Sequence, residues 1–337
     1  MHIILTLGLL WAGGAAPSNQ AKMLERFEAV EPHMGTKFII VLYAPDRQAA
    51  NEGFRAAFSR IAELDRKLSD YNPDSEISRL VKDHPVGKPI TVSKDLLTVL
   101  VAAQAVSRWS GGAFDVTVGP LTKLWRRARR QHRLPSPQRL ARAKQAVGWQ
   151  KLKIDVAHRT VRLTVPNMRL DLGGIAKGYA VDQALHTLRC HHIDRALVNA
   201  SGDLAATGAP PGRRGWRVAI APLKPNQPPT EFGLLANRAI ATSGDAYQYV
   251  EINGKRYSHI VDPHTGLGLE RRSSVSVLAP DCTTADALAS ACSVLPPADA
   301  LCRIEQRPDT ELEIVYRQSE RLVTRMTRGF RQWLSQH

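Results

Sequence analysis

The sequence predicts an α+β fold of mixed, mainly antiparallel sheets flanked by helices. The chain has 337 residues, 43% of them hydrophobic and 23% charged, which suits one large folded domain or two intimate subdomains. Short apolar stretches separated by glycine and proline turns fill the second half, and Asn253-Gly254 between two of them is a strong hairpin signal. Strands therefore outnumber strand–helix–strand units, which disfavours a doubly wound parallel sheet.

The first half of the chain mixes strands with helices. Residues 37–44 (KFIIVLYA) form the first expected strand, and apolar residues at helical spacing predict a helix over residues 54–68. The turn-forming residues 69–74 place a loop after this helix. A second helix is expected to have Ser93 as its N-cap and to stop at Gly111.

A basic run and a hairpin follow. We expect residues 126–133 (RRARRQHR) to be a solvated connection that leads past Pro135 and Pro137 into a short helix. Residues 152–165 alternate apolar and polar side chains as a hairpin does, and the next helix is expected over residues 175–188.

The second half is expected to hold mainly strands. A strand at residues 274–279 precedes a helix over residues 284–295, and the chain is expected to end in a basic tail. The other expected strands are residues 196–200, 216–221, 247–252, 255–261, 311–316 and 321–327.

The charge balance indicates what the protein binds. The chain has 46 Lys and Arg against 31 Asp and Glu, a net charge of +15, which favours anionic partners such as nucleotides, phosphates, acidic proteins or a lipid surface. The basic runs lack the interleaved aromatic residues that single-stranded nucleic acid requires, so we expect solvated faces and no nucleic-acid partner. Four cysteines without a CxxC pair predict neither a disulfide framework nor a zinc site: Cys190, Cys282, Cys292 and Cys302.

The N-terminus resembles a secretory leader. Residues 3–16 form a short apolar run that ends in small residues, although no Lys or Arg precedes it. No cysteine follows the run, so a lipid anchor is not expected there. We expect residues 1–20 to be a signal peptide and the protein to be periplasmic or associated with the periplasmic side of the membrane; a buried N-terminal segment is the alternative.

The most informative motif is residues 170–182 (LDLGGIAKGYAVD). A strand end runs through Gly173 and Gly174 into a helix, where free N–H groups and the positive end of the dipole favour an anion. The glycine and lysine spacing fits neither the Walker loop nor the dinucleotide fingerprint. An ordinary strand-to-helix turn is the alternative.

A second motif places oxygen atoms on one face of a helix. Asp286 and Ser290 are four residues apart, so their side chains lie one above the other, as ligands of a hard cation would. An acidic residue in the first helical turn is also favoured by the helix dipole alone.

A third set of candidates lies in turns. His259 is near the end of a hairpin strand, where functional side chains often emerge, although a structural histidine is the alternative. Residues 241–245 are expected to form a tight hydroxyl-rich turn for capping or for phosphate contact. The glycine turn at residues 110–115 offers Phe114 as a wall for a planar ring.

Eight segments, taken together and in this order, resemble the FAD:protein FMN transferase (ApbE-like) family, and the resemblance runs from about residue 30 to residue 295. Each segment alone is weak, but eight in register are specific. They are MGTKF at 34–38, LSDYNPDSEISRL at 68–80, GGAFDVTVGPLTKLW at 111–125, LDLGGIAKGYAVD at 170–182, SGD at 201–203, ATSGDAYQ at 241–248, YSHIVDPHTG at 257–266 and ADALASA at 285–291.

The resemblance implies a single ApbE-like domain over residues 28–337 with a magnesium-dependent activity. Such an enzyme splits FAD and transfers the FMN half to a protein threonine as a phosphoester, and AMP leaves. The implied partners are FAD and a flavin-acceptor protein with an FMN-binding domain, such as a redox-pump subunit or a membrane-associated flavoprotein.

The family's functional residues are assigned here where this sequence matches its motifs. Lys177 would act on the pyrophosphate, Asp171 would help to hold the nucleotide, and His259 would be the general base for the threonine hydroxyl. The residues that would line the FAD site are Met34, Tyr71, Ala113, Phe114, Asp115 and the backbone of Ile260. The ligands of Mg²⁺ would be the carbonyl of Gly174 and the side-chain oxygens of Asp286 and Ser290.

Two departures from the family pattern stand out. Ser290 replaces the threonine of many members but keeps the hydroxyl, and Ser201 replaces a glycine, which puts the local turn in doubt. Two other functions share most of these residues. An FAD pyrophosphatase would use water as the nucleophile, and a periplasmic FAD-binding protein would bind without catalysis.

Overall fold

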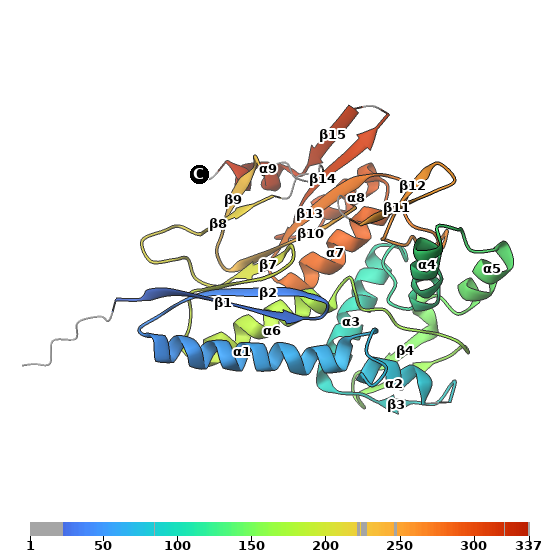
Figure 1. Cartoon of the computed structure of the whole chain (residues 1–337), viewed down its shortest axis with the longest axis horizontal. Helices are drawn as coiled ribbons and strands as arrows, with labels where there is room; N and C mark the ends of the chain where they lie inside the picture. Colours follow the sequence, from blue (N-terminus) through green and yellow to red (C-terminus); the bar gives the residue numbers. More distant parts are fainter. Residues whose placement is uncertain are drawn as a thin grey trace, which may run out of the picture.

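The computed structural model describes residues 23–83, 85–220, 223, 228–245, 248–319 and 321–335, and the expected leader at residues 1–20 lies outside them. Within these ranges, no helix is long and apolar enough to cross a membrane. The α+β prediction is confirmed, because a large antiparallel sheet carries helices on one face and further helices lie at one end of the molecule (Figure 1).

Eight strands form the central sheet, and every neighbouring pair is antiparallel. In sheet order they are β1 (Glu25–His33), β2 (Thr36–Ala44), β6 (Ala196–Ala200), β7 (Asp203–Ala206), β10 (Arg238–Gly244), β13 (Ser273–Ala279), β14 (Glu311–Gln318) and β15 (Arg321–Met326). The sequence predicted β2, β6, β13, β14 and β15, whereas it did not predict β1, β7 and β10.

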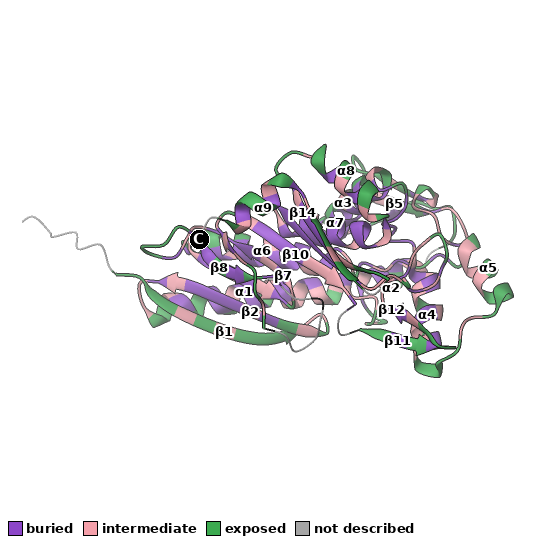
Figure 2. Ribbon diagram, turned by 90° about the horizontal axis from the view of Figure 1, so that it is seen from above, coloured by how far each residue is buried: buried purple, intermediate pink, exposed green. Residues whose placement is uncertain are grey.

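Helices cover one face of the sheet (Figures 1 and 2). They are α1 (Arg47–Leu68), α6 (Ala176–Cys190), α7 (Cys282–Val294) and α8 (Pro297–Glu305), and α3 (Lys94–Trp109) packs against α1 and α7. The predicted N-cap of α3 is confirmed, because the Ser93 hydroxyl accepts a hydrogen bond from the amide of Leu96 at 3.2 Å. Alternate residues of the strands, such as Phe38, Ile40 and Val275, are buried against these helices.

The opposite face of the sheet is covered by a small hairpin and the C-terminal helix. The hairpin is β8 (Trp216–Ala219) with β9 (Phe232–Leu235), and the helix is α9 (Arg328–Leu334). Trp216, Phe330 and Trp333 are buried there with Ile240 and Leu278 of the sheet. The prediction of a basic tail after the last strand is therefore wrong about its structure. These residues form the helix α9, and Phe330 and Trp333 pack it onto the sheet.

A second group of elements lies at one end of the molecule (Figure 1). It comprises α2 (Glu76–Lys82), α4 (Gly119–Gln131), α5 (Pro137–Gln145), the 3₁₀ helix Trp149–Lys151, a small sheet of β3 (Ile90–Thr91), β5 (Thr160–Leu163) and β4 (Leu152–Asp155), and the hairpin of β11 (Tyr249–Ile252) with β12 (Lys255–Ser258). Leu121 and Trp125 of α4 are buried against Val250 and Tyr257 of the hairpin.

Two further predictions about local structure are wrong. The basic run at residues 126–133 lies mostly within α4, because Leu121, Trp125 and Ala128 give this helix an apolar face that packs on the hairpin. Residues 242–244 end the strand β10 and do not form a turn, since they pair in register with residues 274–276 of β13.

The turn between β6 and β7 forms despite the serine in place of a family glycine. Ser201 has φ +53° and Gly202 has φ +104°, so both residues adopt the left-handed conformations that a two-residue hairpin loop requires. The Ser201 hydroxyl bonds to the hydroxyl of Thr36. This turn directs the next residue, Asp203, into the interior.

Candidate active site

A buried charge cluster lies where α6, α7 and β7 meet. Lys177, in the first turn of α6, forms an ion pair with Asp203 at the start of β7, and its Nζ lies 3.9 Å from Oδ2 of Asp286 on α7. Burial lowers the pKa of Lys177, but the two carboxylates outweigh this effect and hold it above its usual value. Lys177 is therefore a fixed positive charge at neutral pH.

The two carboxyl groups of the cluster, Asp203 and Asp286, have pKa values above those of exposed aspartates. Burial raises the pKa of Asp203 despite the neighbouring lysine. Burial and the proximity of Asp203 raise the pKa of Asp286 to about 7, although Lys177 and the Gly178 amide oppose the shift. One lysine therefore does not hold both carboxyl groups in their charged form, and a bound cation would favour that form.

Gly178 allows α6 and α7 to approach closely. Its amide donates to Oδ2 of Asp286 at 3.1 Å. A Cβ atom at this position would lie 2.7 Å from the carbonyl carbon of Cys282 and 2.9 Å from Cβ of Asp286. Because real Cβ atoms do not approach that closely, only glycine fits here, and the contact sets the position of Asp286 relative to Lys177.

Two of the predicted magnesium ligands, Gly174 and Ser290, lie in contact, and the third, Asp286, is on the same helix as Ser290. A Cβ on Gly174 would lie only 2.7 Å from Oγ of Ser290 and 3.2 Å from the ring of Phe114, so the Gly174 backbone contacts both side chains. Asp286 lies one helical turn before Ser290 on α7. A carboxylate, a hydroxyl and a carbonyl are the ligand types that Mg²⁺ prefers, so the residues present fit this ion. Within the described part of the chain, no cluster of three or more His, Cys, Asp or Glu side chains could hold a metal, so a metal site here requires the hydroxyl and carbonyl oxygens as ligands.

His259 follows the last residue of β12 and is partly buried. Its Nδ1 lies 3.2 Å from the carbonyl oxygen of Gln248, and its amide donates to the same oxygen at 3.0 Å. A proton on Nδ1 in this bond leaves Nε2 as the basic nitrogen. Burial, together with the charges of Arg129 and Lys177, lowers the pKa of His259 to about 4 and outweighs the bond to Gln248. The imidazole is therefore neutral near pH 7.

Arg126 links two of the expected FAD-site residues, although the sequence analysis assigned it to a solvated face. Its guanidinium bonds to Asp70 at 2.6 Å and to Asp171 at 3.0 Å. Its Cζ lies 4.2 Å from the centre of the Tyr71 ring, which is 76% exposed. Arg126 thereby joins the loop after α1 to the turn before α6, and that assignment is wrong for this residue.

Three other predicted residues lie in the turn after α3 and in the first hairpin. Ala113 and Phe114 are buried in the main core, and the Phe114 amide donates to the Ser110 hydroxyl at 3.0 Å. Met34, in the β1–β2 turn at φ +49°, donates its amide to Asp65 at 2.8 Å. A pocket of about 440 Å³ lies beside this turn and reaches Tyr71.

Asp115 and Ile260 have intramolecular partners for the groups that the resemblance assigns to FAD. The carboxylate of Asp115 accepts the amide of Thr117 at 2.7 Å and that of Trp149 at 2.8 Å. Burial raises its pKa despite these bonds. The Ile260 amide donates to the Ser258 hydroxyl at 3.1 Å, and its carbonyl accepts from Leu269 at 2.9 Å. Both residues therefore fix the local backbone, and contact with FAD at these positions stays a prediction.

Two site residues were missed by sequence reasoning. Asp203 stood in the Ser-Gly-Asp segment, but its pairing with Lys177 depends on the packing of α6 against β7. Asp182 closes the 170–182 motif, and its carboxylate accepts the amides of Cys282 and Thr283, each at 2.8 Å, at the start of α7. The motif therefore also fixes the second helix of the site.

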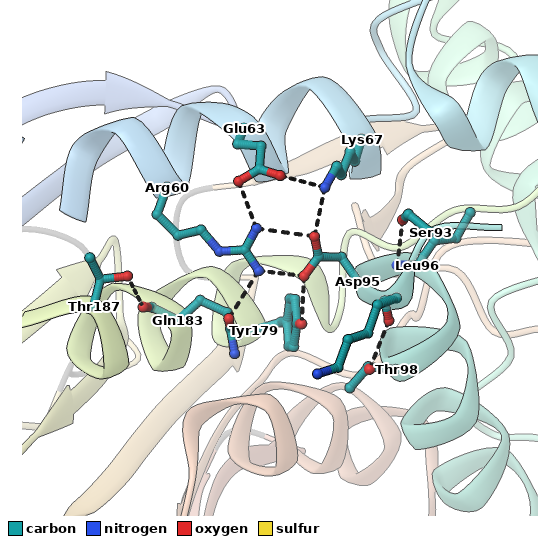
Figure 3. A network of polar contacts seen from close by, with 11 residues as sticks. Arg60, Glu63, Lys67, Ser93, Asp95, Leu96, Thr98, Tyr179, Gln183 and Thr187 are labelled. Carbon is teal, nitrogen blue, oxygen red and sulfur yellow. Dashed lines mark hydrogen bonds and ion pairs between the residues drawn. The ribbon is translucent and has the colours of Figure 1, made fainter. Parts of the chain in front are cut away.

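A polar network joins α6 to α1 and α3 (Figure 3). The Tyr179 hydroxyl donates to Asp95 of α3 at 2.9 Å, and Asp95 also accepts from Lys67 at 2.8 Å and from Arg60 on α1. Burial alone would raise the pKa of Asp95, but Arg60, Lys67 and Tyr179 outweigh it and hold the pKa below the usual range. Tyr179 is two residues from Lys177, so this network fixes the first turn of α6.

A helix N-terminus with Lys177 in its first turn, together with a neutral, partly buried imidazole, suits an enzyme that moves a phosphate-linked group between oxygen atoms. This chemistry and the α+β scaffold define the class, a transferase. The chain belongs to the ApbE family, which it matches over residues 34–314.

Named relatives agree with this membership and with the transferase class. The chain is 32% identical over 278 residues to the FAD:protein FMN transferase of Haemophilus influenzae, with 80% of each chain covered. It is 34% identical over 292 residues to the one of Vibrio cholerae, with 85% of each chain covered.

Solved structures share the fold. The apo form of the flavinyl transferase ApbE from Pseudomonas stutzeri superposes with a TM-score of 0.82 at 28% identity, covering 94% of this chain and 99% of that one. A histidine-to-glycine variant of the flavin transferase ApbE from Vibrio cholerae gives a TM-score of 0.81 at 31% identity, covering 92% of this chain and 100% of that one.

Proposed function

We propose that this protein is a magnesium-dependent FAD:protein FMN transferase that moves FMN from FAD to a threonine of an acceptor protein and releases AMP. The observation that carries the proposal is the cluster of Lys177 with Asp203 and Asp286, beside the contact between Gly174 and Ser290. A fixed ammonium group and a set of oxygen ligands side by side suit a pyrophosphate. The names of the relatives supply the identity of the substrate.

The residues of the cluster divide the work of holding the pyrophosphate. Lys177 offers a positive charge that does not titrate near neutral pH. Gly174, Asp286 and Ser290 would hold Mg²⁺, which when bound would neutralise phosphate charge during the transfer. Asp203 holds the Lys177 side chain in place and keeps it protonated.

His259 would accept the proton of the incoming hydroxyl. Its Nδ1 is engaged with the Gln248 carbonyl, which leaves Nε2 to take the proton from the threonine. The threonine oxygen forms a bond to the phosphorus on the FMN side, the bond from that phosphorus to the bridging oxygen breaks, and AMP leaves with the bridging oxygen. Because its pKa is about 4, His259 is already unprotonated at neutral pH.

The flavin would lie against the aromatic side of the site. Tyr71 is largely exposed and held by Arg126, so its ring offers a planar surface for stacking. Phe114 contacts the Gly174 backbone and would bound the site on the metal side. Met34 and the pocket beside its turn would extend this wall.

The proposal includes an exported location and a protein partner. The apolar run at residues 3–16 supports export to the periplasm. An acceptor with an FMN-binding domain, such as a redox-pump subunit, is the partner proposed from the family resemblance.

One experiment tests the function. The purified protein is incubated with FAD, Mg²⁺ and a flavin-acceptor domain, and the intact mass of the acceptor is measured. We expect the acceptor to become heavier by one FMN, with one AMP released for each transfer. Release of AMP and FMN with unchanged acceptor mass would instead make the protein an FAD pyrophosphatase, and FAD binding without AMP would make it a carrier.

A further inference from the structure

The positive charge of the chain is concentrated in one segment. Residues 116–154 contain 11 of the 46 Lys and Arg residues and none of the 31 Asp and Glu residues. The rest of the chain has 35 basic against 31 acidic residues, a net charge of only +4. This segment forms α4, α5 and β4 at one end of the molecule (Figure 1).

Six exposed cations of this segment form what we call the α4–α5 basic face. On α4, Lys123, Arg127 and Arg130 are spaced by four and three residues, so they form one stripe opposite the buried apolar face. The whole set is Lys123, Arg127, Arg130, Arg133, Arg139 and Arg142. In the part of the chain that the structure describes, none of the six forms an ion pair with a carboxylate.

The basic face borders the candidate active site. Trp125 of α4 donates its indole N–H to the carbonyl of Ser258 at 2.9 Å, next to His259. Arg126, beside the stripe, bonds to Asp171 of the Gly-Gly turn. The apolar face of α4 therefore packs on the β11–β12 hairpin, which leads into His259. Its stripe of Lys123, Arg127 and Arg130 is exposed to solvent near the candidate active site.

We propose that the α4–α5 basic face docks an acidic surface of the acceptor protein and brings its threonine to His259. This inference rests on the proposed function, because only a transferase has a protein acceptor. Of the eleven cations in residues 116–154, only Arg126 pairs with a carboxylate in the described part of the chain, so the segment attracts an anionic partner strongly at long range and speeds encounter. The partner's carboxylates would supply the ion pairs that the face lacks.

Aromatic residues at its margin favour a protein over a lipid surface. Tyr71 is 76% exposed and Tyr249 is 47% exposed, and arginines hold both rings, with Cζ of Arg256 3.9 Å from the Tyr249 ring centre. Tyrosine and arginine are the residues that dominate protein interfaces. Residues 116–154 expose no large apolar side chain that could insert among lipid tails.

The test reverses charge on α5, away from the catalytic residues. Arg139→Glu/Arg142→Glu is compared with Arg55→Glu/Arg189→Glu, which makes the same charge change at exposed positions of α1 and α6. Initial rates of flavin transfer to an acceptor domain of net negative charge are measured against acceptor concentration at about 50 and 300 mM salt. For the α5 variant we expect the KM for the acceptor to rise about 10-fold at low salt with kcat unchanged, and the difference to shrink at high salt.

A binding measurement separates this proposal from the proposed function. Poly-glutamate should bind the unaltered enzyme and the control variant but bind the α5 variant several-fold more weakly, whether or not transfer occurs. AMP release without acceptor should be equal in all three proteins. Equal acceptor KM values, or loss of binding to phosphatidylglycerol vesicles without change in acceptor KM, would overturn the docking proposal and leave the transferase proposal standing.

Discussion

The guanidinium of Arg126 lies over the ring of Tyr71, with its Cζ 4.2 Å from the ring centre, while it bonds to Asp70 and Asp171 at the same time. Three separate segments of the chain are thus joined at one side of the candidate site. Because Tyr71 is largely exposed, we expect this arginine to set the orientation of its ring.

Arg126→Ala should weaken FAD binding. The Tyr71 ring loses the cation that orients it, and a contact of this kind contributes about 1 kcal/mol or more, so we expect the KM for FAD to rise about 5- to 10-fold. The kcat at saturating FAD should change little. Arg55→Ala, at an exposed position of α1 outside the proposed binding surfaces, is the control. Equal KM values for the two variants would contradict the role of Arg126.

Lys177→Met should abolish transfer and destabilise the protein. Asp203 and Asp286 would be left as buried carboxylates without their cation, which costs about 3–5 kcal/mol when one partner of a buried pair is removed. Urea denaturation measures this loss. Lys177→Met/Asp203→Leu should recover part of the stability but no activity. A double variant as unstable as Lys177→Met alone would show that the pair is not coupled.

The His259 imidazole should give an unusually acidic pH profile. Its pKa is about 4 because burial disfavours the charged form, and the reaction needs the neutral form. At saturating Mg²⁺, which when bound would keep Asp286 ionised, we therefore expect kcat/KM for FAD to be level from about pH 6 to 8 and to fall only below about pH 5. His259→Gln should remove this limb together with nearly all activity. If the acidic limb of kcat/KM instead had its midpoint near the ordinary histidine pKa of about 6.5, burial would not lower the pKa of His259 as proposed.

The same pKa has a consequence for stability. The unfolded chain protonates His259 near its ordinary pKa of about 6.5, whereas the folded protein resists protonation down to about 4. The unfolded state therefore binds more protons between these values, and the free energy of unfolding falls as pH is lowered from about 6.5 to 4. His259→Gln should make urea denaturation less sensitive to pH in this window.

Gly178→Ala should separate α6 from α7. The added methyl group would meet the backbone at Cys282 and the Cβ of Asp286, neither of which can move without shifting a helix. We expect a loss of about 1–3 kcal/mol in the free energy of unfolding and a large fall in kcat. Gly53→Ala is the control, because there the nearest atoms are the flexible ends of Ile193 and Leu188. Similar loss of activity in both variants would contradict a specific role for the α6–α7 contact.

Periodicity predicted the elements that bury apolar side chains. The helices α1, α3, α6 and α7 and the strand β2 show regular apolar spacing, because one face of each is buried in the main core. The strand β1 was not predicted because most of its residues are exposed. The helix α4 was not predicted, because its many arginines resemble a solvated segment and only Leu121, Trp125 and Ala128 form its buried apolar face.

Local motifs located the candidate site, but the pairs within it are set by the fold. Gly174, Asp286 and Ser290 were grouped by the family resemblance, and the structure brings the backbone of the first against the hydroxyl of the last. The partners of Lys177 and Tyr71 could not be deduced from spacing. Asp203 is 26 residues from Lys177. Arg126 and Tyr71 belong to different elements and meet only after packing.

Within the described residues, β1 is an edge strand of the central sheet, and one row of its backbone groups has no neighbouring strand. On that strand, β1, acidic side chains at Glu25, Glu28 and Glu31 point largely to solvent, and Pro32 removes one amide donor near its end. A second molecule that tried to add its own β1 there would bring carboxylates against carboxylates. The exposed polar side chains that made β1 hard to predict therefore also disfavour edge-to-edge pairing of this strand with a second copy, and so disfavour assembly into fibres.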